Sequence, residues 1–249
     1  MSSSDVSLPL IAVVVPVKNE ADNILPLITE IAAAFSGRWP FEIIYVDDGS
    51  DDATPARLDA AKNDYPQLRV IRHRQSCGQS QAVASGVKAA RAPYVATLDG
   101  DGQNDPADVP ALFERLLAVP EADRDMLLVA GHRQKRQDTG LRRLSSKVAN
   151  GVRAAMLGDA TPDSGCGLKV FSREAFLDMP RFNHMHRFLP ALMIRRGGKV
   201  ISVRVNHRPR ERGQSKYGLW NRLWVGIVDL FGVMWLQRRA SVPVIDRRD

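Results

Sequence analysis

Residues 8–17 read LPLIAVVVPV, and this stretch points to the fold class. It is rich in β-branched residues and carries no charge, as expected of a strand buried on both faces of a parallel sheet. Helix and strand patterns then alternate, with short connections, as far as residue 130. We predict further strands at 41–46, 68–73, 93–98 and 126–130, and helices ending near residue 35 and covering 54–64, 78–91 and 106–118. This alternation favours a doubly wound α/β sheet, mostly parallel and flanked by helices, whose ligand lies beyond the carboxyl ends of the strands.

The chain beyond Gly131 is more helical. Helical patterns cover about 141–157, 173–178 and 188–196, and a strand pattern covers 199–205. The last apolar stretch, Leu219 to Leu236, has 18 residues and is interrupted by Asn221, Arg222 and Asp229. A spanning helix needs about 20 mostly apolar residues, so we expect an amphipathic helix here rather than a membrane span.

Bulky apolar residues recur in this last stretch at helical three-and-four spacing, and Arg238 and Arg239 follow it. They are Leu219, Trp220, Leu223, Trp224, Ile227, Phe231, Met234 and Trp235. We therefore divide the chain into a main domain, 1–217, and a C-terminal amphipathic helix with a basic tail, 218–249. The apolar face either lies in a membrane interface, with the arginines at anionic headgroups, or packs on the main domain or a second subunit.

The composition excludes several classes of protein. With 249 residues, 44% of them apolar and 25% charged, the chain is long enough to bury a full core and is not a low-complexity or disordered sequence. Its two cysteines exclude a disulfide framework and a cysteine-rich zinc module, and we expect Cys166 to be a packing residue. No Lys or Arg precedes the first apolar run, so the N-terminus does not resemble a signal peptide and we expect a cytoplasmic protein.

Charge is distributed unevenly along the chain. Residues 1–130 hold 11 Lys and Arg against 19 Asp and Glu, whereas residues 131–249 hold 24 against 9. This asymmetry indicates a basic surface in the second half that meets an anionic partner: a nucleic acid, a phosphorylated substrate or an acidic membrane face. A well-solvated, arginine-rich surface without a partner is the plainer interpretation.

An acidic turn directly follows the strand expected at 93–98. Its sequence, Asp99-Gly-Asp-Gly-Gln103, places the oxygens of Asp99, Asp101 and Gln103 at alternate positions. Hard oxygen ligands at that spacing suit one Mg²⁺ or Mn²⁺, which would neutralise a departing diphosphate. A solvated turn in which Asp and Gly only satisfy the backbone is the alternative. The position at the carboxyl end of a strand, together with a second acidic turn, favours the metal site.

The second acidic turn is Asp47-Asp-Gly-Ser50, and Pro16-Val-Lys-Asn-Glu20 ends the neighbouring first strand. Carboxylates at such positions bind ribose hydroxyls or a base edge in dinucleotide sites. Helix capping by Ser50, Asp51 or Asp52 is the plain alternative, and both interpretations can hold together.

Five segments, in this order and spacing, resemble a family 2 glycosyltransferase of the GT-A fold. They are Pro16-Val-Lys-Asn-Glu20, Val46-Asp-Asp-Gly-Ser50, Gly78-Gln-Ser-Gln-Ala82, Asp99-Gly-Asp-Gly-Gln103 and Gly131-His-Arg133. Within that family the chain resembles the dolichol-phosphate mannosyltransferase and bacterial polyprenyl-phosphate glycosyltransferase branch. This second resemblance rests on the segment from His207 to Tyr217, HRPRERGQSKY, which is similar to the Arg-x-x-Gly-x-Ser-Lys segment of that branch. The resemblance covers about residues 11 to 217 and implies a Rossmann-like, nucleotide-binding catalytic domain.

The resemblance implies three groups of site residues. The donor nucleotide and its diphosphate would be bound by Pro16, Lys18, Glu20, Asp48, Asp99 and Gly100. The divalent metal, Mg²⁺ or Mn²⁺, would be held by Asp99, Asp101 and Gln103. The diphosphate or the acceptor phosphate would be met by Arg133, Arg210, Ser215 and Lys216, a role suited to guanidinium and ammonium donors. A surface loop with scattered cations is the alternative for the last segment.

Asp101, Asp163 and Arg133 are the catalytic candidates that the resemblance implies. The segment Asp163–Lys169 is similar to the family's acceptor side, where an Asp serves many inverting members as a base. A lipid phosphate is already largely dianionic at neutral pH, so Asp163 would instead orient the sugar or hold Lys169. We expect no histidine metal site, because no two histidines have the helical His-x-x-x-His spacing of a zinc site.

The resemblance implies an inverting, metal-dependent transfer of a hexosyl group. The group would pass from a nucleotide diphosphate sugar to a polyprenyl monophosphate, on an enzyme bound peripherally to the cytoplasmic membrane face. A soluble or glycan acceptor is the alternative within the enzyme class. A non-catalytic anion-binding module is the alternative from another class, but 6% aromatic residues and no stacking motif argue against nucleic acid. The donor sugar, its base and the oligomeric state stay open.

Overall fold

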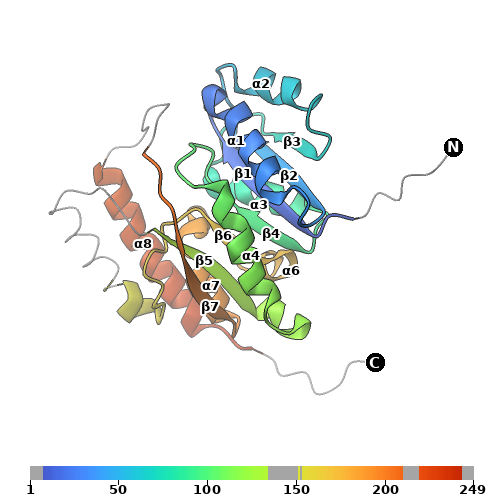
Figure 1. Ribbon diagram of the computed structural model, residues 1–249. Coiled ribbons are helices and arrows are strands. Elements are labelled where there is room, and N and C mark those ends of the chain that lie inside the picture. The colour runs from blue at the N-terminus through green and yellow to red at the C-terminus, as the bar shows by residue number, and fades with distance from the viewer. Residues whose placement is uncertain (1–7, 134–150, 152, 210–218, 243–249) are drawn as a thin grey trace, which may run out of the picture.

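The computed structural model describes residues 8–133, 151, 153–209 and 219–242. Its framework is a seven-stranded sheet in the order β3-β2-β1-β4-β6-β5-β7 (Figure 1). The strands are β1 (Ile11–Val17), β2 (Phe41–Asp47), β3 (Leu68–Arg72), β4 (Tyr94–Thr97), β5 (Leu127–Arg133), β6 (Lys169–Ser172) and β7 (Lys199–Val205). β1 is parallel to β2 and β4, β2 to β3, and β5 to β7, whereas β6 is antiparallel to both β4 and β5. The prediction of a mostly parallel α/β sheet is confirmed.

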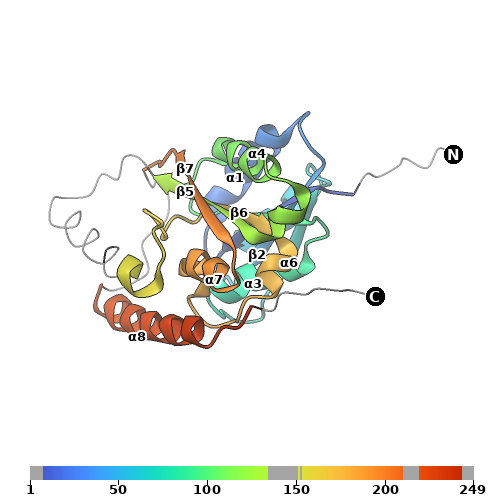
Figure 2. The same cartoon turned by 90° about the horizontal axis from the view of Figure 1, so that it is seen from below.

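Helices cover both faces of the sheet, as Figure 2 shows from below. One face packs on α1 (Ala21–Phe35) and α4 (Val109–Leu117). The other face packs on α3 (Gln79–Ala89), α6 (Arg173–Leu177) and α7 (Leu189–Arg195), with α8 (Leu219–Arg238) lying against α7. The remaining helices are α2 (Thr54–Ala61) beside α1, and the 3₁₀ turns η1 (Pro106–Asp108), η2 (Glu121–Met126) and η3 (Met185–Arg187).

Strand β1 lies at the centre of both cores. Val13 and Val15 join the core under α1 and α4, whereas Ala12 and Val14 join the core under α3, and all four are fully buried. A strand without a solvent face needs apolar residues at every position, which is why residues 8–17 form an unbroken apolar run.

Some predicted bounds differ from the structure. The strand predicted at 126–130 continues to Arg133, which brings that side chain to the edge of the sheet. Of the helix predicted at 141–157, residues 153–157 are helical, and most of the rest lies outside the described residues. The sequence pattern defined no range for β6, because four residues are too few to show a period.

Helix α8 is apolar on two sides, which differs from the single apolar face that we predicted. Val233 is buried, and Leu230 and Met234 pack with it against the core that contains α7. Phe231 and Trp235 face solvent and are 54% and 58% exposed. We predicted that Met234 and Phe231 lie on the same apolar face. In the structure Met234 packs on the domain, whereas Phe231 lies on the solvent side of the helix. In the part of the chain that the structure describes, no helix combines the length and apolar character that crossing a bilayer requires.

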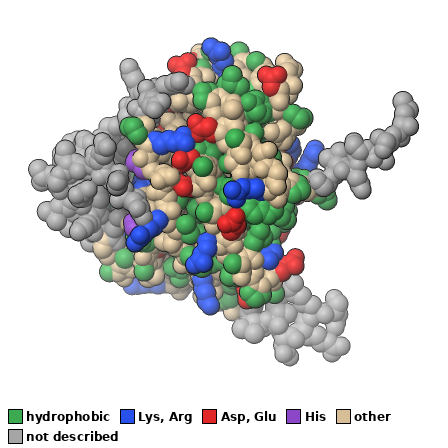
Figure 3. All heavy atoms as spheres, viewed as in Figure 1, with side chains coloured by type: hydrophobic (Ala, Val, Ile, Leu, Met, Phe, Trp, Pro, Cys, Tyr) green, Lys and Arg blue, Asp and Glu red, His purple; other side chains and the backbone are tan. Residues whose placement is uncertain are grey.

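Charged side chains are interspersed on the face drawn in Figure 3. Lys and Arg alternate there with Asp and Glu over the described residues, and no patch of one sign covers it. The described part of this face therefore does not by itself form the basic surface expected from the charge asymmetry.

Candidate active site

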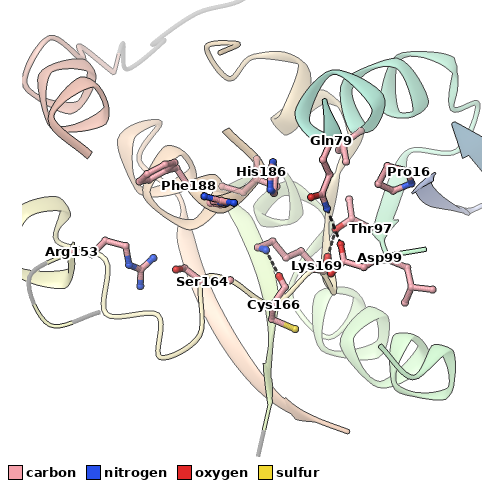
Figure 4. Close-up of a pocket in the computed structure, with 16 residues that line it drawn as sticks. Pro16, Gln79, Thr97, Asp99, Arg153, Ser164, Cys166, Lys169, His186 and Phe188 are labelled. Carbon is pink, nitrogen blue, oxygen red and sulfur yellow. Dashed lines mark hydrogen bonds between the residues drawn. The ribbon is translucent and has the colours of Figure 1, made fainter. Parts of the chain in front are cut away.

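The candidate site lies where the carboxyl ends of the parallel strands meet the start of β6. Lys169, the first residue of β6, pairs with Thr97 at the end of β4 and with Ala130 in β5. Because β6 is antiparallel to both neighbours, the preceding segment, 163–168, reaches the same edge as the turn after β4. The segments that we predicted to carry chemistry thus converge at one edge of the sheet (Figure 4).

The acidic turn after β4 is held by its own backbone and by the end of β1. The Asp99 N–H donates to Asn104 Oδ1 at 3.1 Å, and the Gln103 N–H donates to Asp101 Oδ1 at 3.1 Å. Gly100 is buried, and a Cβ there would lie 2.4 Å from Val17 Cγ1. Only glycine lets the turn approach β1 this closely. Gly100, which we predicted in the donor site, is therefore also required for packing.

Asp99 and Asp101 form the acidic centre of the site. The Gln79 side chain, at the start of α3, donates through Nε2 to Asp99 Oδ1 at 2.8 Å. Burial raises the pKa of Asp99 above its ordinary value, and the neighbouring Asp101 raises it further. A divalent cation would remove this repulsion, and two carboxylates with the Gln103 amide oxygen are donors that Mg²⁺ and Mn²⁺ accept. The residues present therefore fit the predicted metal.

Arg133 and Asp163, both predicted as catalytic, lie side by side. Arg133 donates through Nε to Asp163 Oδ2 at 2.7 Å and through Nη2 to Asp163 Oδ1 at 2.8 Å. This two-pronged hydrogen bond raises the pKa of Arg133 further above its ordinary value. Asp163 thus fixes the guanidinium in one orientation at the end of β5. The described hydrogen bonds of the Asp163 carboxylate go to Arg133.

The predicted nucleotide side is built from the ends of β1 and β2. Asn19 donates its N–H to Ser50 Oγ, and Glu20 donates its N–H to Thr54 Oγ1, both at 2.9 Å. Glu20 Oε2 accepts a hydrogen bond of 2.7 Å from Asn23, while Lys18 is exposed. The two segments that the sequence assigned to the nucleotide are therefore adjacent.

Asp48 fixes a loop at the start of α3. Its carboxylate accepts hydrogen bonds from the His73 ring, the Ser76 hydroxyl and the N–H groups of Cys77 and Gly78, at 2.7 to 2.8 Å. Burial alone would raise the pKa of Asp48, but these hydrogen bonds lower it below its ordinary value. Ligand atoms of Asp48, His73 and Cys77 also lie within 4.8 Å of one another. Because both oxygens of Asp48 are already engaged, we assign this group to loop structure.

The basic C-terminal segment departs from the acidic turn. His207 forms a β-bridge with Asn104, and the Arg208 N–H donates to the Gln103 carbonyl at 3.0 Å. The Arg208 guanidinium also pairs with Glu30 and Asp105, at 2.6 and 2.7 Å. Arg210, Ser215 and Lys216 lie outside the described residues. The segment that should carry them nevertheless begins beside the predicted metal ligands.

A cavity of about 460 Å³ opens next to Asp99. Pro16, Gln79 and Lys169 contribute to its wall, together with His186 from η3 and Arg153 (Figure 4). Arg153 and His186 received no role from the sequence, because isolated polar residues form no motif, and Gln79 was included only as part of the Gly78–Ala82 segment.

Gly167 is a further residue that sequence reasoning missed. A Cβ at this position would lie 2.1 Å from Asp99 Oδ2, so the glycine lets segment 163–168 approach the acidic turn. Thr97 reinforces this approach by donating its hydroxyl to the Gly167 carbonyl at 2.7 Å. The two glycines of the segment DSGCGLK were the available signal.

This sheet, with an acidic turn after β4 and an antiparallel strand inserted beside it, has the GT-A fold of glycosyltransferases. Solved structures of glucosyl-3-phosphoglycerate synthase from Mycobacterium tuberculosis share it. The complex with UDP matches with a TM-score of 0.69 and 20% identity, over 95% of this chain and 82% of that chain. The complex with Mn²⁺, UDP-glucose and glycerol 3-phosphate matches with a TM-score of 0.67 and 20% identity, over 95% and 82%. At this identity the likeness establishes the fold.

The family follows from sequence. The model of glycosyl transferase family 2 matches residues 12–179. Dodecaprenyl-phosphate galacturonate synthase of Rhizobium johnstonii is 35% identical over 241 residues, which are 94% of this chain and 69% of that protein. Undecaprenyl-phosphate 4-deoxy-4-formamido-L-arabinose transferase of Edwardsiella ictaluri is 33% identical over 215 residues, 86% of this chain and 64% of that protein. The chain thus spans about two thirds of the length of these relatives. It belongs to glycosyl transferase family 2 and is a glycosyltransferase.

Proposed function

We propose that this protein transfers a hexosyl group from a nucleotide diphosphate sugar to a polyprenyl monophosphate, with inversion, at the cytoplasmic face of the membrane. The observation that carries the proposal is the placement of the Asp99–Asp101 turn near the Arg133–Asp163 pair, beside a cavity that Asp99 lines. The names of the two relatives, both polyprenyl-phosphate sugar transferases, support the acceptor class.

The donor is bound along the ends of β1, β2 and β4. Pro16, Lys18 and Glu20 contact the nucleotide, and Asp48 shapes the nucleotide site through the loop that it fixes at the start of α3. Asp99, Asp101 and Gln103 would hold Mg²⁺ or Mn²⁺, and this ion would supply positive charge to the departing diphosphate. The raised pKa of Asp99 fits this role, because a carboxylate that is costly to ionise alone gains most from a bound cation.

The acceptor phosphate enters from the side of β5. Arg133, oriented by Asp163, binds this phosphate, and Arg210, Ser215 and Lys216 of the basic segment are its further candidate ligands. A phosphate oxygen attacks the anomeric carbon, the bond from that carbon to the diphosphate oxygen breaks, and the sugar is left β-linked to the lipid phosphate. The attacking oxygen carries no proton to remove, so Asp163 acts by positioning Arg133 rather than as a base.

Helix α8 brings the site to the membrane surface. Its outer side exposes Val228, Phe231 and Trp235, and the exposed Arg238 and Arg239 follow. Trp and Phe are suited to the acyl boundary, and arginines to anionic headgroups. Gln237 donates to the Leu157 and Ala191 carbonyls, and Arg195 donates to the Leu236 carbonyl, so these hydrogen bonds attach the inner side of α8 to the domain.

The deciding experiment is a donor panel assayed with short-chain polyprenyl phosphate and Mn²⁺. We expect transfer from at least one of GDP-mannose, UDP-glucose, UDP-uronic acids and UDP-N-acetylhexosamines, and loss of transfer with a chelator. Transfer only to a soluble glycan would replace the lipid acceptor. Metal-independent binding of anions that weakens steeply with salt, without any transfer, would favour a non-catalytic module.

A further inference from the structure

His186, in the turn η3, has no role in the proposed transfer although it lines the cavity beside Asp99 (Figure 4). The volume of this cavity, about 460 Å³, suits one small ligand. Asp99 lines the same cavity, so a donor whose diphosphate is bound at the acidic turn would extend its sugar into this space. The hydrogen bonds of the His186 ring therefore bear on how the substrates are held.

Ser80, in α3, holds His186 in place. The Ser80 hydroxyl oxygen lies 2.7 Å from His186 Nδ1 and also accepts the His186 backbone N–H at 3.2 Å. These two contacts to one oxygen orient both the backbone and the ring of His186. Ser80 is only 4% exposed, so its own hydroxyl proton needs an acceptor inside the protein.

The proton of Ser80 determines which ring nitrogen of His186 carries hydrogen. Among the described residues, Nδ1 is the acceptor found for this hydroxyl, because the backbone N–H can only donate. A hydroxyl that donates to Nδ1 requires this nitrogen to be unprotonated, which places the proton of the neutral ring on Nε2. Nε2 has no hydrogen bond within the described ranges and is not fully buried, so it is the ring nitrogen that a ligand in the cavity can reach.

The surroundings of His186 do not suit a general base. Burial, together with the positive charges of Arg187 and Lys169, lowers the pKa of His186 to about 3. A base for neutral pH needs a pKa closer to 7 and a lone pair that faces the substrate. In His186 the lone pair of Nδ1 faces Ser80, and Nε2 presents a proton to the cavity.

We propose that His186 contacts the substrates through its Nε2–H, which donates a hydrogen bond to a substrate oxygen in this cavity, and that it takes up no proton during transfer. The oxygen belongs to a hydroxyl of the transferred sugar or to a phosphate, since both accept such a bond. Ser80 is a positioning residue that acts through His186. The inference rests on the proposed function for the identity of the substrates, whereas the tautomer of His186 depends on contacts within the protein alone.

The tautomer can be measured by NMR on the full chain without any substrate. In protein labelled with ¹⁵N-histidine, we expect the ring correlations of His186 to show a protonated Nε2 and an unprotonated Nδ1, unchanged from about pH 5 to 8. The resonances are assigned by their loss in His186→Gln. A protonated Nδ1, or a titration within this range, overturns the inference.

A matched pair of variants tests the contact with substrate, using the donors of the panel and short-chain polyprenyl phosphate. His186→Asn can keep an acceptor for Ser80 near the position of Nδ1 but removes the cavity donor, so kcat/KM should fall at least about tenfold while the melting temperature stays near that of the wild type. His186→Gln places an amide N–H near the position of Nε2 and should keep at least about a third of the wild-type kcat/KM. Asn183→Ala, which alters an exposed residue before η3, should change nothing.

The constant that changes in His186→Asn identifies the bound oxygen. Weaker donor binding, measured by calorimetry without acceptor, assigns the oxygen to the sugar, whereas a raised acceptor KM assigns it to the phosphate. Unchanged kinetic constants with a lower melting temperature would make His186 only a link between η3 and α3, and overturn the inference. An equal loss in both variants, or the loss of the rising limb of the pH profile in His186→Gln, also overturns it.

The inference stays testable if a variant or the assay fails. If His186→Asn does not fold, the Nε2 chemical shift of the wild type with and without UDP-glucose, GDP-mannose and the other donors replaces it, and a shift that no donor changes overturns the inference. Absence of transfer from every donor by the wild type refutes the proposed function, whereas the NMR and calorimetric measurements still decide the role of His186.

Discussion

Two carboxylates of this molecule have opposite surroundings, and these surroundings determine what each can do. Asp99 is buried near a second carboxylate, which makes its charged form costly. Asp48 is also buried, but four hydrogen bonds stabilise its charged form. The first is suited to a cation, and the second is suited to holding a loop.

Removing Asp101 should abolish transfer without unfolding the protein. Asp101→Ala leaves the departing diphosphate uncompensated, so we expect activity to fall by several orders of magnitude while the melting temperature stays close to that of the wild type. Asp123→Ala, an exposed carboxylate in η2, is the control and should keep full activity. A rate above about a tenth of the wild type, a barrier change under about 1.4 kcal/mol, would exclude the metal assignment.

Removing the charge of Asp48 should cost stability in a pH-dependent manner. A carboxylate whose pKa is lowered by folding stabilises the protein above its unfolded value of about 3.9, and this stabilisation is lost as the pH falls through the folded value. Asp48→Asn should therefore lower the free energy of unfolding by about 2 kcal/mol at neutral pH, and by less as the medium is acidified. Urea denaturation at several pH values measures this. The exposed Asp64→Asn should change little, and equal losses in both variants would contradict the assignment.

Strand β6 supplies what the parallel strands lack, a segment that reaches the acidic turn from the opposite direction. The close approach depends on Gly167, whose Cα lies against the Asp99 carboxylate, and on the hydroxyl of Thr97. In the same segment Gly165 has more room, since a Cβ there would lie 3.6 Å from its nearest neighbour, Arg133 Nη2.

These two glycines make a matched pair for mutation. Gly167→Ala should displace Asp99 and lower Mn²⁺-dependent activity at least about tenfold, at a stability cost of about 1–3 kcal/mol from overpacking. Gly165→Ala should retain activity, because its Cβ meets only ordinary van der Waals contacts. Measurement of Mn²⁺ affinity for both variants separates metal loss from general damage. Similar affinities for Mn²⁺ would show that Gly167 does not shape the acidic turn.

The exposed side of α8 is expected to bind membranes. Trp235→Glu should weaken binding to anionic liposomes at least about tenfold, and added salt should weaken wild-type binding, because both apolar and ionic contacts contribute. Leu25→Glu, which alters an exposed leucine of α1, should bind as the wild type does. Co-sedimentation with liposomes is the assay, with donor binding as the check on folding. Unchanged co-sedimentation of Trp235→Glu would show that the exposed side of α8 does not bind the membrane.

Much of the architecture could be predicted from the sequence, because β1 is an unbroken apolar run, α1 and α4 have a helical apolar period, and acidic turns mark the strand ends. The separate roles of the site residues could not be predicted from the sequence. Asp48 and Asp99 both follow a strand and adjoin a glycine, and only the packed structure shows which oxygens are already engaged. Gly167, Arg153 and His186 act through contacts between segments far apart in the chain, which no local pattern records.

The chain has an acidic first half and a basic second half. The proposed nucleotide and metal ligands lie in the first half, and the proposed phosphate-binding cations lie in the second. The strands that end near the predicted nucleotide and metal residues come from the acidic half, whereas Arg133, Lys169 and the basic segment come from the other. Residues 134–150, which lie outside the described ranges, alone hold five Lys and Arg against one Asp. We therefore expect phosphate recognition to depend on particular cations of the second half rather than on its total charge.

Three variants distinguish specific contact from total charge. Lys216→Ala and Arg210→Ala should raise the acceptor or donor KM or lower kcat, because each removes a phosphate contact. Arg247→Ala, in the basic tail, should change neither constant. Steady-state kinetics at constant ionic strength provide the comparison. Equal effects at all three positions would mean that the basic half acts only through its overall electrostatic field.

The position of β6 also has a consequence for the order in which the protein is made. It is the last strand but one along the chain, yet it lies inside the sheet and joins β4 to β5. While the ribosome is still synthesising residues before Lys169, β1 to β4 can assemble through local crossovers, but β4 keeps an unpaired edge. Such an edge invites pairing with other nascent chains. Gly167 and Lys169 arrive with the strand that covers this edge, so a chain that ends before β6 has neither a continuous sheet nor a finished site.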